Sequence, residues 1–439
     1  MELNKFSTSI WLLCSCLLAT QPAFAQSETV DPFADPFSSD PFSTDPFSTD
    51  QTEEQEESAA EHQTRVEWKS FYQVSNERDN HPFNPGLVPF SDYRRETMLD
   101  MNWSTRWNDQ WRSKFRVYSS WHGSEVNTGF DTWLLEGSVQ WQSDNRNWVV
   151  EAGRIKPQWS NGYNWDIANL LQPMRNRPYI DQDDPLQNKG WDMVSVQYFV
   201  DSWNFSGYII DSDQVNADVE AVLRMAWQGA QSYSFLIHKV EGIKPAYAAT
   251  FSTLLTDDMT IRAEWSAHPQ RQIPFLKQAV DDKSYYHRWV VGTTFSHPEG
   301  WSLTAEYFNN QHGFDESEWD AFANATRESR INYLNQQANG ADFEQLFGSL
   351  NVLRSGWMKK HYGSLMFMSA ESEDLWSIRA SIQASLDDGS QLHRIEILKS
   401  FSDAWTGRFQ LEAFQGCDYC EYGLNPNEQT ARLVISRIW

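Results

Sequence analysis

The chain has 439 residues, a formal net charge of −25 and a mean hydropathy of −0.62, yet it contains 22 tryptophans and 15% aromatic residues. The negative charge excludes a nucleic-acid-binding protein, which needs a basic surface. There is no run of about eighteen apolar residues, which excludes a transmembrane helix. Many aromatic residues with a low mean hydropathy suit a transmembrane β-barrel, because only alternate residues face lipid and aromatic residues line both interfaces.

Residues 1–25 predict a secretory signal peptide. Lys5 gives a positive start, residues 10–19 form an apolar middle, and residues 23–25, Ala-Phe-Ala, form a cleavage site of the small-x-small type. We therefore expect an exported protein.

Residues 26–63 predict a disordered periplasmic tail. Asp-Pro-Phe occurs four times, and the stretch holds eleven acidic residues and no Lys or Arg. Such a segment cannot bury enough apolar surface to offset the entropy of ordering it. It is either a solvated acidic spacer or a docking tail whose Phe residues bind a periplasmic protein at several points.

Residues 64–439 predict an all-β domain, a single antiparallel transmembrane β-barrel. In residues 375–386 apolar and polar residues alternate, with Trp376, Ile378 and Ile382 in the apolar set. The alternation recurs about eighteen times without a helical period that would supply a covering layer, so we expect lipid on one face and water on the other. Sixteen strands is the alternative count. The expected strands are 66–74, 94–107, 111–121, 132–141, 148–155, 191–200, 203–210, 219–228, 231–238, 246–255, 259–267, 286–296, 301–309, 357–369, 375–386, 392–401, 405–415 and 430–439.

The connections between these strands separate by parity. Those after even-numbered strands are short, as at 108–109 and 201–202, and those after odd-numbered strands are often long, as at 156–190 and 311–356. Short periplasmic turns and long outer loops are typical of barrels with periplasmic termini. The pattern predicts the outer membrane of a Gram-negative bacterium as the location, with outer-membrane lipid around the barrel.

The last strand supports this location. Leu433, Ile435 and Trp439 fall on one face, and the chain ends on the aromatic residue, as barrels of this kind do. Arg437 interrupts that apolar face.

The polar faces of the strands predict the lining of the lumen. Basic and acidic candidates nearly balance, so we expect the net negative charge to lie in the tail and loops. One interpretation is a lattice of paired charges. The other is a selectivity lining, because Arg112, Lys114 and Arg116 form a basic ladder with few local acids that would favour an anionic solute. The candidates include Arg106, Arg112, Lys114, Arg116, Arg262, Arg379, Arg394, Arg408, Glu264, Glu396 and Glu412.

Two outer loops differ from the rest. Residues 156–190 carry Trp159, Tyr163, Trp165, Arg175 and Arg177. Aromatic rings stack on sugars and Arg pairs with carboxylates, so one interpretation is a site for an acidic sugar or organic acid. The other is a constriction loop folded into the barrel mouth and held by its own aromatic residues. Residues 311–356 predict a short helical cap or plug.

Cys417 and Cys420 lie in the last outer loop and predict a local disulfide, as expected after export. A zinc site needs four ligands and there is no second cysteine pair, so we expect no metal, and nothing indicates a cofactor. Four histidines, His238, His268, His287 and His393, are not tied to a nucleophile by any motif, so we do not expect an enzyme.

Residues 153–165, Gly-Arg-Ile-Lys-Pro-Gln-Trp-Ser-Asn-Gly-Tyr-Asn-Trp, followed by Asn169 and Pro173, resemble a recurrent pattern of outer-membrane barrels. That pattern places Gly-Arg/Lys-Gln near a strand end, then Trp-Gly, an aromatic residue and Asn-x-x-x-Pro. The group includes the alginate-export type porins. The resemblance implies eighteen strands and an Arg-rich lumen for an anionic polysaccharide. Here Ser160 and Asn161 separate Trp from Gly, and Ile155 replaces Gln.

Taken together, the sequence predicts a porin-like outer-membrane channel for a polar solute, with an anionic solute or an acidic saccharide as the finer expectation. The alternative is a non-conducting scaffold or surface-polysaccharide assembly component that docks a periplasmic partner through the Asp-Pro-Phe tail.

Overall fold

The computed structural model describes residues 61–78, 81–89, 91–124, 127–171, 189–211, 220–271, 285–355, 357–370 and 375–439. Among these residues, no helix is both long and apolar enough to span a membrane. The predicted signal peptide, the tail as far as residue 60, and Arg175 and Arg177 lie outside the described residues.

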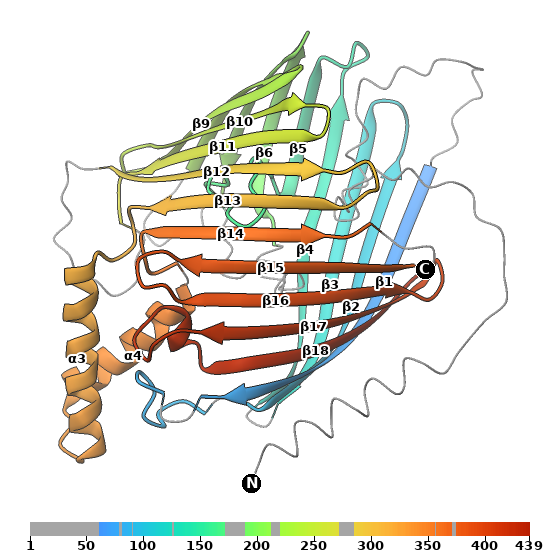
Figure 1. The fold of residues 1–439 in the computed structure, drawn as a ribbon. Coiled ribbons are helices and arrows are strands. Elements are labelled where there is room, and N and C mark those ends of the chain that lie inside the picture. The colour runs from blue at the N-terminus through green and yellow to red at the C-terminus, as the bar shows by residue number, and fades with distance from the viewer. Residues whose placement is uncertain are drawn as a thin grey trace. The chain divides into compact units, whose positions relative to one another are not determined.

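Eighteen strands of the described chain form one antiparallel sheet (Figure 1). Each strand pairs with its neighbours in sequence, and β1 also pairs with β18, so the sheet closes into a barrel. The prediction of eighteen strands is confirmed. The strands are β1 (Glu61–Glu77), β2 (Tyr93–Arg106), β3 (Trp111–Ser124), β4 (Thr128–Gln142), β5 (Trp148–Ile155), β6 (Trp191–Val200), β7 (Trp203–Ile210), β8 (Glu220–Gln228), β9 (Gln231–Val240), β10 (Ala246–Thr256), β11 (Met259–His268), β12 (Tyr286–Ser296), β13 (Ser302–Asn310), β14 (His361–Met368), β15 (Trp376–Ser385), β16 (Gln391–Ser400), β17 (Trp405–Gln415) and β18 (Asn427–Ile438).

The alternation of residue types along each strand matches its two faces. On β15 the side chains of Ile378 and Ile382 are each 44% exposed, whereas Arg379 and Gln383, the residues that directly follow them, are buried. Exposed apolar side chains recur on the same outward face of the other strands. An apolar outer face around a polar interior is the surface that lipid requires of a closed barrel.

Arg437, which interrupts the apolar face of β18, lies between two outward aromatic rings. Its guanidinium carbon is 5.2 Å from the ring centre of Trp405 and 4.6 Å from that of Trp439. Aromatic residues are enriched at the membrane interface, where a cation can reach water while its stem covers apolar surface. The arginine therefore belongs to the interfacial ring at this end of the barrel.

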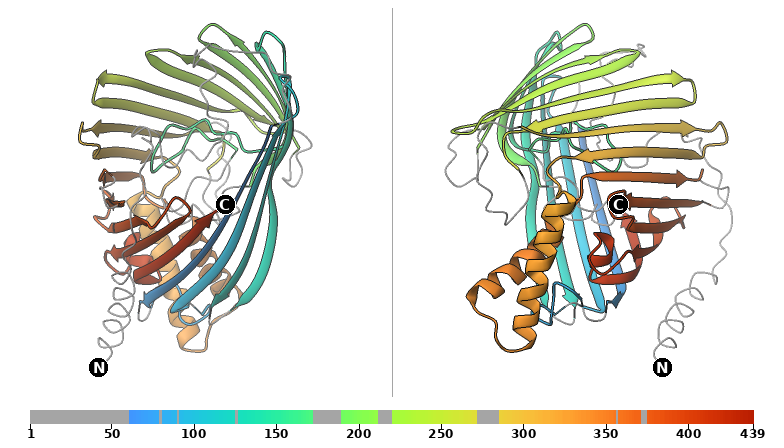
Figure 2. Two further views of the ribbon diagram at one scale, coloured as in Figure 1. Left: turned by 90° about the vertical axis from the view of Figure 1, so that its right-hand side faces the viewer. Right: turned by 60° about the vertical axis from the view of Figure 1, so that its left-hand side comes forward.

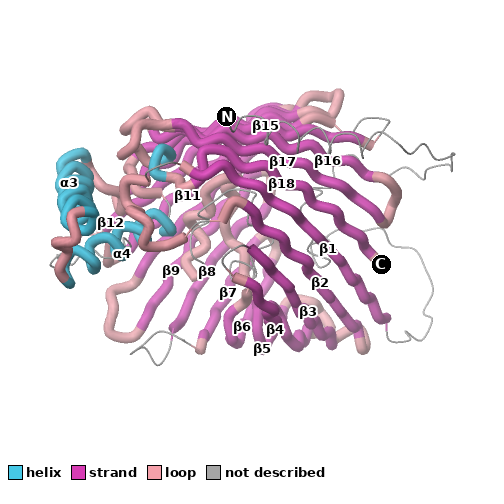
Figure 3. The backbone as a smooth tube through the Cα atoms, turned by 90° about the horizontal axis from the view of Figure 1, so that it is seen from below, coloured by secondary structure: helices cyan, strands magenta, loops and turns pink. Residues whose placement is uncertain are grey.

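The two ends of the barrel differ in their connections. Turns after even-numbered strands are short, as in residues 201–202 and 229–230, and the long connections follow odd-numbered strands. The longest of these contains α3 (Glu316–Leu334) and α4 (Gly340–Ser355). Figures 1 and 3 show the helices at the end of the barrel opposite the C-terminus. The sorting of connections by parity, predicted from the sequence, is thus present in the fold.

Three outer connections pack into one layer, which we call the outer cap: residues 81–89, residues 311–355 with 357–360, and residues 416–426. Phe83, Phe314, Trp319 and Leu424 are buried together within it. Trp319 Nε1 donates to the carbonyl oxygen of Tyr419 at 2.9 Å. Figure 2 shows both helices of the cap at this one end of the barrel.

Candidate functional site

Residues 156–171, here called the inward loop, leave the end of β5 and pack against the inner face of the barrel. Trp159 lies 5.3 Å from the ring of Tyr208 on β7. Trp165 is fully buried and lies 5.2 Å from Phe308 on β13 and 5.6 Å from Trp357 of the outer cap. The loop's own aromatic residues, Trp159 and Trp165, therefore hold it in place by packing against aromatic residues of the wall and cap.

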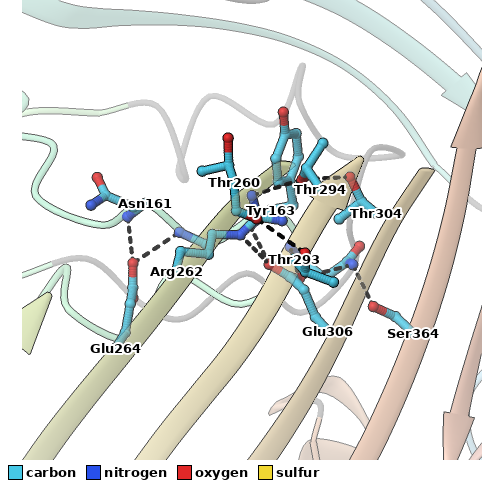
Figure 4. A network of polar contacts seen from close by, with 12 residues as sticks. Asn161, Tyr163, Thr260, Arg262, Glu264, Thr293, Thr294, Thr304, Glu306 and Ser364 are labelled. Carbon is cyan, nitrogen blue, oxygen red and sulfur yellow. Dashed lines mark hydrogen bonds and ion pairs between the residues drawn. The ribbon is translucent and has the colours of Figure 1, made fainter. Parts of the chain in front are cut away.

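Glu264 of β11 is the first polar anchor of the inward loop. Its carboxylate accepts hydrogen bonds from Ser160 Oγ at 2.7 and 2.8 Å, from the N–H of Gly162 at 2.8 Å and from the N–H of Ala168 at 3.2 Å. The N–H of Asn161 donates to it as well (Figure 4). One buried carboxylate thus satisfies four groups of the loop.

Glu306 of β13 is the second anchor. It accepts from the N–H groups of Tyr163 and Asn164, both at 2.9 Å, and from Asn164 Nδ2 at 3.0 Å. Asn164 Nδ2 also donates to Ser364 Oγ at 2.7 Å, which extends the contact to β14 (Figure 4). Arg262 of β11 donates to the same carboxylate at 3.1 Å, and its guanidinium lies 4.2 Å from the ring centre of Tyr163.

The two anchors supply hydrogen-bond acceptors that an irregular segment inside a barrel otherwise lacks. Its backbone N–H groups have no neighbouring strand, and leaving them unpaired away from water costs free energy. The carboxylates of Glu264 and Glu306 accept these N–H groups instead. At Gly162 the chain turns so tightly that a Cβ atom would collide with the carbonyl oxygen of Trp165. The sequence between Trp159 and Trp165 is therefore fitted to this place on the wall.

The wall from β15 through β18 to β4 has a different lining. Arg394 of β16 donates to Glu412 of β17 at 2.6 Å, and both side chains are only 2% exposed. Arg379 of β15 contacts Glu396 of β16 at 3.2 Å, and Arg408 of β17 lies 3.9 Å from the same carboxylate. These inward charges form ion pairs between adjacent strands.

The basic ladder of β3 also faces carboxylates. Lys114 Nζ lies 2.9 Å from Glu136 of β4, and Arg116 donates to both oxygens of Asp100 of β2. The sequence expectation of few local acids is wrong at Lys114 and Arg116, because Glu136 stands opposite Arg116 in the register. Arg112 lies next to Arg106 across the β2–β3 pair, and Arg106 donates to Asp109 at 2.8 Å.

Sequence reasoning left Arg65, Arg94 and Arg432 out of the predicted lining. Arg432 of β18 donates to Gln73 Oε1 at 2.9 and 3.2 Å and lies 4.5 Å from the ring centre of Phe71. Its position in the alternating polar set of the last strand was the available signal.

Cys417 and Cys420, predicted as a local pair, are joined by a disulfide. They lie in the part of the outer cap between β17 and β18. Among the described residues, no group of three or more His, Cys, Asp or Glu side chains is arranged to hold a metal ion.

A closed barrel with an apolar outer face and a long loop folded against its inner wall has the fold of an outer-membrane β-barrel. Solved structures share this fold. The chain is similar to OccK5 (OpdH) of Pseudomonas aeruginosa, at 9% identity over 86% of this chain and 97% of that chain, with a TM-score of 0.51. It is also similar to Pseudomonas aeruginosa OpdQ, at 8% identity over 86% and 97%, with a TM-score of 0.52. Acinetobacter baumannii OccAB1 matches at 8% identity over 86% and 96%, with a TM-score of 0.52.

At this level of identity the likeness concerns the fold alone. No protein family model and no curated protein matches the sequence.

Proposed function

We propose that the chain is an outer-membrane channel through which a small polar solute passes between the inward loop and the charged wall of β15–β18 and β1–β4. The observation that carries this proposal is the one-sided anchoring of the loop. The described partners of the loop lie on neighbouring strands of one side. Tyr208, Glu264, Glu306 and Phe308 belong to β7–β13, and Ser364 belongs to β14. A loop fixed to one side narrows a lumen without needing contacts all round it.

The finer part of the proposal is a preference for anions. On β15–β18 and β1–β4 the alternation directs more basic than acidic side chains inward. A surplus of positive charge on a confined wall raises the local concentration of anions. The inward basic residues there are Arg65, Lys69, Arg94, Arg106, Arg112, Lys114, Arg116, Arg379, Arg394, Arg408 and Arg432. The inward acidic residues are Glu67, Glu77, Glu96, Asp100, Asp131, Glu136, Glu396 and Glu412, together with Glu428 at the irregular start of β18, so the basic residues still outnumber them.

Single-channel conductance of the refolded barrel in a planar bilayer tests the proposal. We expect steady current, a reversal potential in a KCl gradient that indicates anion preference, and a shift toward cations when Arg112, Lys114 and Arg116 are changed to Gln. Arg146→Gln, in the exposed turn between β4 and β5, is the control and should not shift the potential. A folded but silent barrel would contradict the channel and favour the scaffold that docks a periplasmic partner through the tail.

An acidic saccharide is the narrowest form of the proposal. It is supported by the resemblance of residues 153–165 to the alginate-export type porins. Oligouronates should then interrupt the current at lower concentration than neutral oligosaccharides of equal length. Equal block by both would remove the saccharide from the proposal and leave the channel.

A further inference from the structure

The last outer connection contains a carboxylate buried inside the outer cap. Glu421 is 7% exposed and lies next to the disulfide-bonded Cys420. Its carboxylate accepts from Tyr362 Oη at 2.5 Å and from the N–H groups of Lys359 and Met358 at 3.2 and 3.3 Å. One side chain therefore joins residues 416–426 both to the end of the helical connection and to β14.

Charged groups surround this carboxylate on several elements. The N–H of Glu421 donates to Asp388 Oδ2 at 2.8 Å, in the connection between β15 and β16. Lys359 Nζ lies 4.0 Å from the same Asp388 oxygen and 4.3 Å from the ring centre of Trp319. Asp387 and Asp320 also act on Lys359 through space. The charge of Arg394 on β16 acts through space on Tyr422, the residue after Glu421.

The same contacts lead to the inward loop. Tyr362, which donates to Glu421, lies 6.3 Å from Trp165, and both rings contact Trp357, at 5.2 and 5.6 Å. Trp165 is the residue by which the inward loop packs under the outer cap. A movement of the cap that carries Trp357 away from Tyr362 and Trp165 would therefore change the packing on which the loop rests.

We propose that Glu421 is a proton-operated latch, which holds the outer cap down on the barrel mouth and on the inward loop when its carboxyl group is protonated. The cap has two states in this proposal: docked, with Glu421 buried against Tyr362, and lifted, with Glu421 in water.

The sign of the pH effect follows from burial. Desolvation raises the pKa of Glu421 to about 7 in the docked state, although the hydrogen bond from Tyr362 opposes the rise. In the lifted state the carboxyl group returns toward its ordinary pKa of 4.5. Because the docked state binds the proton more tightly, docking is strongest below the lower value and weakens as the pH rises through the higher one.

Hydrogen exchange of the Met358 amide, which donates to Glu421, measures the latch; the Lys359 amide donates to Glu421 and also to Tyr362 Oη at 2.6 Å, and is read beside it. After correction for intrinsic exchange, we expect protection to fall by a factor on the order of 50 to 100 between pH 5 and pH 8. Burial also lowers the pKa of Lys359, so the comparison stops at pH 8. Glu421→Gln should remove the pH dependence. Asp418→Asn, an exposed carboxylate in the same connection, should keep it.

Tyr362→Phe keeps the ring against Trp165 and removes the hydroxyl that donates to the ionised carboxylate. We expect its transition to move to higher pH, and this variant tests the latch if Glu421→Gln does not fold. Equal protection at pH 5 and pH 8 in the unchanged protein, or a pH dependence that survives in Glu421→Gln, would overturn the proposal. These readouts need no ion current, so they stand apart from the channel proposal. An increase in current fluctuations above pH 7 is expected only if both the channel proposal and the latch proposal are correct.

Discussion

The two sides of the barrel wall use buried carboxylates in different ways. Glu264 and Glu306 accept backbone N–H groups of the inward loop, whereas Glu396 and Glu412 pair with arginines of neighbouring strands. On the first side the carboxylate replaces the missing partner strand of an irregular segment. On the second it balances charge within the sheet. The role of an inward acidic residue on a barrel strand therefore depends on the group it contacts, and not only on its position in the strand.

The largest effect is expected on the ion-paired side, at Arg394. Changing Arg394 to Met leaves Glu412 as a charge buried at 2% exposure without its guanidinium. Breaking a buried pair from one side costs about 3–5 kcal/mol, whereas replacing both partners by apolar residues is often neutral. We therefore expect the single variant to lower the urea midpoint of unfolding strongly, and Arg394→Met with Glu412→Leu to recover most of it. A double variant as unstable as the single one would show that the loss does not come from the unpaired charge of Glu412.

On the loop side the corresponding variant is Glu306→Gln. The amide keeps its shape but turns one acceptor oxygen into a donor that faces the N–H groups of the loop, so the loop should detach rather than the barrel unfold. Hydrogen bonds to a charged acceptor contribute roughly 1.5–3 kcal/mol each. We expect larger and noisier single-channel current, and also a lower urea midpoint, because the buried guanidinium of Arg262 loses its ion pair with Glu306. Glu412→Gln is the matched control: we expect it to lower the midpoint as well, but to leave the current unchanged, because Glu412 pairs with Arg394 of the neighbouring strand.

The fold was predictable from the sequence because the patterns that specify it involve residues close together in the chain. Alternation with a period of two gives the strands, and connection length gives the two ends of the barrel. The partners on the ion-paired side also lie within one strand pair, as at Arg394 and Glu412. The anchoring of the inward loop joins residues far apart in sequence: Glu264 lies 103 residues from Asn161, and Glu306 lies 142 residues from Asn164. No periodicity carries that information, so those carboxylates resembled any other lining residue.

The smallest loss of stability is expected at Arg262, and it compares the two sides most directly, because Arg262 is a cation on the loop side. Changing it to Met removes one donor from Glu306 and one cation from the ring of Tyr163, but the three donors from Tyr163 and Asn164 stay. The carboxylate is thus never left without partners. A cation over an aromatic ring contributes about 0.5–2 kcal/mol, so we expect a loss in that range, well below that of Arg394→Met. Urea unfolding of the two variants side by side measures this. Equal losses would mean that Glu306 depends on its guanidinium as Glu412 does, and that the two sides of the wall are built alike.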